Sequence, residues 1–128
     1  SKHQNKIIPL FLCFGWITVV GKEIVKEFIS RHISAKPTRI SLKLDWNGGR
    51  SQIMVKGDSL EVVEYFEDLS FSSFARGVIE SYEQAFGKLN VVPISFREEI
   101  YKNDKVALHL YPTGSEGIFD IFIKYNSA

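Results

Sequence analysis

The chain has 128 residues, and 16 Lys and Arg side chains nearly balance 15 Asp and Glu, for a formal net charge of +1. This balance argues against a dedicated nucleic-acid-binding protein, which usually carries a strong basic excess. Hydrophobic residues make up 45% and charged residues 24% of the chain, which is typical of a globular domain and excludes extensive disorder.

The length fits one domain over residues 1–128 with its own hydrophobic core. A single Cys permits no intrachain disulfide, so we expect an intracellular, cytoplasmic protein. Because the chain begins with Ser1 and not with Met, we expect it to be a trimmed chain or a fragment of a longer one.

The first apolar stretch, Ile7–Val20, allows three interpretations. It is shorter than the roughly 20 residues that span a bilayer, so no transmembrane segment is expected. It fits a buried strand over Ile7–Phe14, the first turns of a helix, or the remnant of a targeting signal. We favour the strand, because a helix would have to contain Gly15 and Gly21 at a cost of about 1 kcal/mol each.

The next segments show a helical period and then a strand period. Apolar residues recur every three to four positions from Ile17 to about Ser34, which predicts an amphipathic helix. Strict alternation over Thr38–Trp46 and again over Ser51–Lys56 predicts two half-buried strands. The Asn and two Gly residues at positions 47–49 predict a tight hairpin between them.

Two helices are predicted in the middle of the chain. Asp58 and the Glu three residues after it have the spacing of a capping box, which predicts a short helix ending near Leu69. Ser70 offers a second N-cap, and apolar residues then recur at four-residue steps up to Phe86. Gly87 is the expected end of this second helix.

The last third of the chain predicts mainly strands. Val91–Phe96 is a short extended piece that contains a proline, and Glu98–Lys105 is polar and predicts a loop. Lys105–Tyr111 and Ile118–Tyr125 alternate and predict a hairpin, joined by Pro112–Gly117. This hairpin also offers a sheet edge that can pair with another chain.

This order of elements predicts the α+β class. It matches a ferredoxin-like fold, a split β-α-β antiparallel sheet with helices on one face, with an added C-terminal hairpin. Such a fold supports many unrelated functions, so function has to be argued from particular residues.

The sequence carries no catalytic signature. Gly15 and Gly21 lie where a phosphate-binding loop would be, but the spacing to Lys22 is one residue too long, and Glu23 replaces the hydroxyl residue that holds magnesium. The three His and the one Cys share no metal-ligand spacing. We therefore predict no catalytic residue, no metal site and no cofactor, and we favour a protein that is not an enzyme.

Charge is segregated along the chain. Residues 22–56 carry eight basic against three acidic side chains, a net +5, and residues 57–84 carry one basic against seven acidic, a net −6. Alternation in the two strands of the central hairpin places Arg39, Lys43 and Lys56 on its outward face, and we predict that they form a basic surface. The short helix predicts an acidic surface made of Glu61, Glu64 and Asp68. These charges fit either solvated faces or surfaces for partners of opposite sign.

The leading hypothesis is a non-catalytic protein–protein interaction module, such as an assembly or adaptor domain or an inhibitor or immunity-type protein. Its partner would be another protein or a second copy of the chain. The first alternative is a small-ligand-binding or enzymatic ferredoxin-like domain, with His109 or the loop at 113–117 at the rim of a pocket between sheet and helices. The second is an RNA-binding sheet, which is disfavoured because the outward face of the strand at 38–46 carries no aromatic residue.

Overall fold

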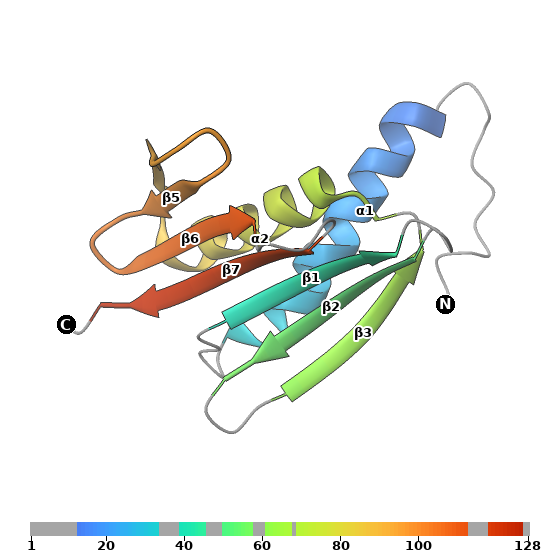
Figure 1. Ribbon diagram of the computed structural model, residues 1–128, viewed down its shortest axis with the longest axis horizontal. Helices are drawn as coiled ribbons and strands as arrows, with labels where there is room; N and C mark the ends of the chain where they lie inside the picture. The colour runs from blue at the N-terminus through green and yellow to red at the C-terminus, as the bar shows by residue number, and fades with distance from the viewer. Residues whose placement is uncertain are drawn as a thin grey trace.

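The computed structural model describes residues 13–33, 39–45, 50–57, 61–67, 69–112 and 118–126, which form two helices and one seven-stranded sheet (Figure 1). The elements in chain order are α1 (Cys13–Ser30), β1 (Arg39–Asp45), β2 (Arg50–Lys56), β3 (Glu61–Glu67), α2 (Phe71–Phe86), β4 (Asn90–Pro93), β5 (Glu99–Lys102), β6 (Val106–Pro112) and β7 (Ile118–Tyr125).

All neighbouring strands of the sheet are antiparallel, in the order β3-β2-β1-β7-β6-β5-β4. Both helices lie on the same face of this sheet (Figure 1). The predicted α+β class and antiparallel sheet are therefore confirmed. The ferredoxin-like arrangement is not confirmed. The prediction that the C-terminal hairpin offers a sheet edge is wrong. The last strand, β7, lies in the middle of the sheet between β1 and β6, and β6 lies between β7 and β5.

The first six of the eight residues of the predicted first strand are not tested, because residues 7–12 lie outside the described part of the chain. Cys13 and Phe14 belong to α1, so the predicted strand is wrong at its C-terminal end, and the helix continues through Gly15 and Gly21. No helix within the described residues is long and apolar enough to span a membrane.

Helix α2 is the element that the sequence predicted most closely. The Ser70 hydroxyl accepts a hydrogen bond from the Ser73 backbone N–H at 3.1 Å, as an N-cap should. At the other end Gly87 has a φ of 97°, in the region that favours glycine, and its N–H donates to the Glu83 carbonyl. The predicted cap residues at both ends are confirmed.

Two predictions in the second half are wrong. The short helix over residues 58–69 is instead strand β3, and the polar loop over 98–105 contains strand β5. In β3 the side chains of Val62 and Phe66 pack toward the core while those of Val63 and Tyr65 are exposed, which is the alternation of a strand. Strand β3 pairs with β2, and β5 pairs with β4 and β6. This pairing overrides the local signals in both segments.

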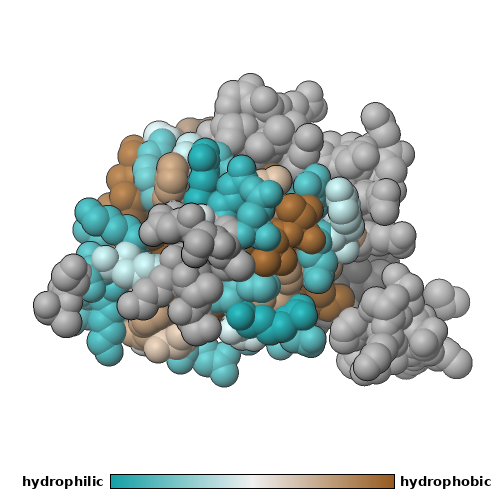
Figure 2. All heavy atoms as spheres, turned by 90° about the horizontal axis from the view of Figure 1, so that it is seen from below, coloured by the Kyte–Doolittle hydropathy of each residue, from teal (hydrophilic) through white to brown (hydrophobic). Residues whose placement is uncertain are grey.

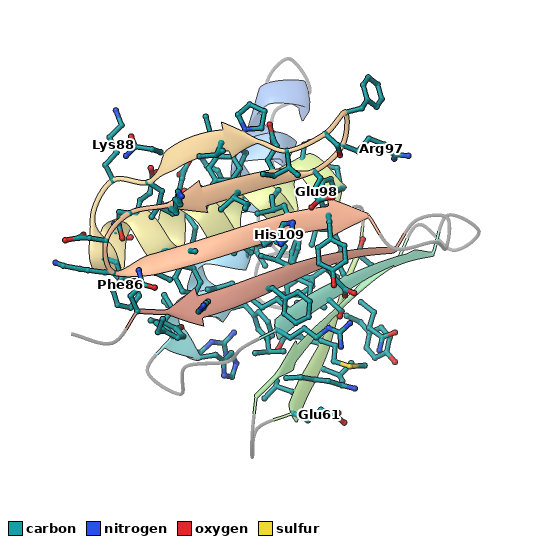
Figure 3. The ribbon with its side chains drawn as sticks, turned by 60° about the vertical axis from the view of Figure 1, so that its left-hand side comes forward. Glu61, Phe86, Lys88, Arg97, Glu98 and His109 are labelled. Atoms are coloured by element: carbon teal, nitrogen blue, oxygen red, sulfur yellow. The ribbon has the colours of Figure 1, made fainter. Side chains whose placement is uncertain are left out.

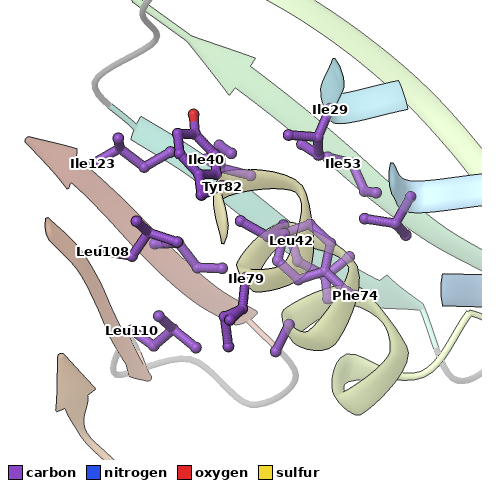
Figure 4. Packing of buried hydrophobic residues seen from close by; sticks show 14 of the residues in the cluster. Ile29, Ile40, Leu42, Ile53, Phe74, Ile79, Tyr82, Leu108, Leu110 and Ile123 are labelled. Atoms are coloured by element: carbon purple, nitrogen blue, oxygen red, sulfur yellow. The ribbon is translucent and has the colours of Figure 1, made fainter. Parts of the chain in front are cut away.

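The core lies between the sheet and the two helices (Figure 4). In β1, β2, β6 and β7, alternate described side chains point toward the helices and are buried, while the intervening ones point to the other face. The sheet contributes Ile40, Leu42, Ile53, Val55, Val106, Leu108, Leu110, Ile121 and Ile123. The helices contribute Val25, Phe28, Ile29, Phe74, Val78, Ile79 and Tyr82. This single apolar layer leaves the opposite face of the sheet free for other side chains.

Helices α1 and α2 are in close contact at Gly77. A Cβ atom at this position would lie 2.7 Å from two atoms of the Val25 side chain and 3.0 Å from the Lys22 carbonyl oxygen. Gly21 in α1 faces a looser contact, where a Cβ would meet Leu69 and Ser73 at an ordinary 3.6 Å. Gly77 is therefore required by packing, and Gly21 is not.

Replacing these two glycines by Ala is expected to change stability in opposite directions. Gly77→Ala should lower the free energy of unfolding by about 1–3 kcal/mol, because the new methyl group overpacks the contact with Val25. Gly21→Ala should raise it by up to about 1 kcal/mol, because Ala is the better helix former. Urea denaturation of both variants measures the difference, and equal effects at the two positions would contradict this account.

Candidate binding surface

The face of the sheet opposite the helices, here called the open face, is covered by no described helix or strand. Figure 3 looks onto this face, with β6 and β7 in front and the helices behind. Strand register aligns one side chain from each of five neighbouring strands on this face, because directly opposed residues project to the same side. In order across the sheet these residues are His109, Phe122, Arg39, Lys56 and Glu61.

Four side chains on the open face form a continuous contact, here called the central stack: His109, Tyr111, Phe122 and Arg39. The rings of Tyr111 and Phe122 are nearly parallel, at 18°, with centroids 5.7 Å apart. The His109 ring centroid lies 5.2 Å from that of Tyr111, and the Arg39 guanidinium carbon lies 5.0 Å from the centre of the Phe122 ring. Tyr111 and Arg39 come from strands on either side of β7, so they reach Phe122 from opposite sides.

Asp120 holds the Arg39 end of the central stack. Its carboxylate is buried, with a side chain only 7% exposed, and accepts a hydrogen bond from Arg39 Nη2 at 3.1 Å. The Ser41 hydroxyl donates to the other carboxylate oxygen. The hydrogen bond and then the charge of Asp120 raise the pKa of Arg39, so the guanidinium stays charged. Arg39 itself keeps 45% of its side chain exposed, so an oriented cation faces solvent.

Glu98 holds the His109 end of the central stack. Its Oε2 lies 2.5 Å from His109 Nε2, and both side chains are about one-third exposed, at 31% and 36%. Figure 3 shows the two residues side by side, His109 on β6 and Glu98 just before β5. The central stack is therefore tied at both ends by charged hydrogen-bond partners, which restricts the rotation of its side chains.

The predicted basic surface is only partly assembled in the structure. Arg39 and Lys56 lie directly opposite one another on the open face. Lys43 belongs to the same face by register, two positions beyond Ser41 on β1, but its side chain is not among those described. Lys56 forms an ion pair with Glu61, with 3.6 Å between nitrogen and oxygen, and Arg39 forms a closer one with Asp120 at 3.1 Å.

The predicted acidic surface is wrong as a helix face. Glu61 and Glu64 lie on strand β3, three positions apart, and therefore project to opposite faces of the sheet. Glu61 is on the open face, whereas Glu64 is on the helix side, where it lies 3.9 Å from Arg31. Asp68 lies outside the described residues. Glu61 and Glu64 thus share no surface.

Much of the segregated charge is paired within the chain. Glu80 of α2 lies 3.2 Å from Lys22 and 3.6 Å from Lys26 of α1, and 3.7 Å from Arg76. Partial burial alone would raise the pKa of Glu80, but the hydrogen bond and charge of Lys22, with the charges of Lys26 and Arg76, keep the pKa below its usual value. With Arg31–Glu64 and Lys56–Glu61, these contacts join the basic and acidic stretches of the sequence.

Sequence reasoning missed the aromatic part of the open face. His109 and Tyr111 alternate with buried Leu108 and Leu110, which places both on the open face. Phe122 was not singled out, although it alternates with buried Ile121 and Ile123 and is 41% exposed. An exposed aromatic residue at an outward position of a predicted strand was the available signal.

The described surface also exposes hydrophobic atoms elsewhere. Figure 2 shows them in patches surrounded by hydrophilic side chains. The large hydrophobic residues that are exposed are Val63, Tyr65, Val91, Ile94, Phe96 and Phe122. The described residues contain no group of three or more His, Cys, Asp or Glu that could hold a metal ion.

Comparison of the chain with known protein-family models, curated proteins and solved structures found no match.

Arg39 and Asp120 are expected to stabilise the fold cooperatively. In a double-mutant cycle of Arg39→Ala and Asp120→Ala, urea unfolding should give a coupling energy of about 1–2 kcal/mol, because removing the cation leaves a buried carboxylate. Lys56 and Glu61 form the matched control, since their side chains are 48% and 63% exposed. Their coupling should be at most about 1 kcal/mol and smaller than that of the central pair. Equal coupling in both cycles would exclude a special role for Asp120.

Proposed function

We propose that the chain is a non-catalytic binding module that docks a partner protein on its open face, with Arg39, Tyr111 and Phe122 at the centre of the contact. The observation that supports it best is the central stack, a row of aromatic and cationic side chains already ordered on an uncovered sheet. Tyr and Arg are enriched among residues that contribute most to protein–protein affinity.

Preorganisation is the physical reason why such a stack suits a binding surface. Ordering a flexible side chain at an interface costs about 0.5–1.5 kcal/mol, and Arg39 and Tyr111 are already held by Asp120 and Phe122. Phe122 is 41% exposed and Arg39 45%, so both retain surface for a partner to cover. A partner that presents a carboxylate to Arg39 and an apolar side chain to the ring edges would match this surface.

The ring geometry favours a protein over single-stranded RNA. Proteins that bind single strands stack bases on aromatic faces. In the central stack, Phe122 has Arg39 on one side and Tyr111 on the other, and Tyr111 also contacts the His109 ring. The rings engage one another by their faces and offer mainly their edges, which suits side chains better than bases.

The small-ligand alternative receives less support. Its pocket was expected between the sheet and the helices, where buried Phe74, Ile79 and Tyr82 now pack against the strands (Figure 4). His109, its candidate acid–base group, is bonded to Glu98 on the open face and not in an enclosed cavity. The loop at 113–117 lies outside the described residues.

A photo-crosslinking amino acid at position 124 tests this proposal, because Lys124 is exposed on the open face two residues from Phe122. In extract from cells that encode the chain, we expect a discrete protein adduct. Crosslinking from Gln84, exposed on α2, is the matched control and should not give this adduct. Arg39→Ala and the double variant Tyr111→Ala, Phe122→Ala should reduce the adduct about tenfold, provided circular dichroism shows them folded.

Three results would contradict the proposal. One is an adduct that nuclease removes, which would indicate nucleic acid. Another is the same adduct from position 84. The last is an adduct that the three open-face substitutions leave unchanged.

A further inference from the structure

The two edges of the sheet differ in their ability to accept another strand. Edge strand β4 has four residues and ends in Pro93, after which the chain turns back with a 2.9 Å hydrogen bond from Ile94 N–H to the Glu98 carbonyl. Short length and proline are features that block edge pairing. Edge strand β3 has seven residues without proline or glycine, and no other described strand pairs with its outer side. Its outer backbone groups are a template for an added strand.

Acidic residues occur at every third position of β3, with apolar or aromatic residues between them. On the open face, Glu61 has a side-chain exposure of 63%, and Val63 and Tyr65 are 39% and 59% exposed. On the helix side, Glu64 is 42% exposed beside Arg31 at 3.9 Å. Glu67 occupies the last position of the strand. An added strand would therefore meet acids at both ends of β3 and apolar surface between them.

The existing partner of β3 shows which side-chain pattern this strand accepts. In β2, Lys56 lies opposite Glu61 and Arg50 lies opposite Glu67, while Met54 lies opposite Val63. The Lys56 ammonium is 3.6 Å from the Glu61 carboxylate. Cross-strand neighbours interact in the same way on either side of a strand, so a strand with cations at both ends and an apolar residue between them also fits the outer side.

A second copy of the chain fits this edge poorly. Antiparallel pairing of two β3 strands over all seven residues would place Glu61 opposite Glu67 and Glu64 opposite Glu64. Like charges directly opposite one another destabilise a sheet. The charges of β3 therefore select a basic strand over a copy of itself.

We propose that the outer edge of β3 accepts an extended segment of a partner protein with basic residues at both ends, as an eighth antiparallel strand. This contact is separate from the central stack and does not depend on the proposed function. Backbone hydrogen bonds supply the attachment, and Glu61 and the apolar surface of Val63 supply the selectivity.

The test uses a capped synthetic peptide with the sequence of β2, RSQIMVK, added to the whole isotope-labelled chain in a nuclear magnetic resonance titration. We expect chemical-shift changes in the amides of residues 61–67 and none in those of residues 90–93. A control peptide with Glu at both ends, ESQIMVE, should bind more weakly. Glu61→Gln should weaken binding of the basic peptide by roughly 1.5- to 5-fold, the range expected for one cross-strand charge pair.

A charge exchange makes the test specific. Glu61→Lys should weaken binding of RSQIMVK and strengthen binding of RSQIMVE, whose terminal Glu then faces the new cation. Circular dichroism should show both variants folded, because the Glu61 side chain is largely exposed. Shifts confined to residues outside 61–67, or equal binding of the basic and acidic peptides, would overturn the proposal. So would β3 shifts that appear without peptide as protein concentration rises, since they would identify a second copy as the occupant.

Discussion

The pairing of β1 with β7 is the contact on which the rest of the structure depends. These strands are distant in sequence: Arg39 bonds to Asp120, 81 positions later. Their pairing joins the sub-sheet β3-β2-β1 to the sub-sheet β7-β6-β5-β4. On one face this produces a continuous apolar layer for both helices. On the other it brings Arg39 of β1 to Phe122 and Asp120 of β7, so the central stack exists only when this pairing has formed.

The tertiary structure also changes the meaning of the charge pattern. In sequence, a net +5 stretch precedes a net −6 stretch, which suggested two separate interaction surfaces. In the structure these stretches face each other through Lys22 and Glu80 between the helices, and through Lys56 and Glu61 between neighbouring strands. Much of the segregated charge is thus used inside the chain. On the open face, Arg39 combines an oriented cation with an adjacent aromatic ring.

The two faces of the sheet differ in how their side chains are packed. The helix side holds the large buried side chains, and the close approach at Gly77 brings α1 and α2 together above them. The open side holds side chains that contact one another but stay partly exposed. A rigid sheet with one packed face can display such side chains without reordering them, because their positions are set by backbone register. Edge strand β3 extends this surface, since Val63 and Tyr65 belong to both the open face and the edge.

Local sequence signals determined the elements whose causes are local. Ser70 and Gly87 marked the ends of α2, and alternation identified β1, β2, β6 and β7 with their inward residues. The α+β class followed from these elements. Of the proposed site residues, Arg39 and Lys56 were placed on the correct face of the hairpin, because a tight hairpin pairs neighbours in sequence.

Tertiary structure decided the features that depend on distant partners. Residues 61–67 carry helix-like spacing and residues 99–102 are polar, yet both became strands because a neighbouring strand supplied their backbone hydrogen bonds. The place of β7 in the middle of the sheet, and with it the contact of Phe122 with Arg39, has no local signature. Periodicity shows which side of a strand faces the core, but the neighbour of that strand is chosen by the packing of the whole sheet.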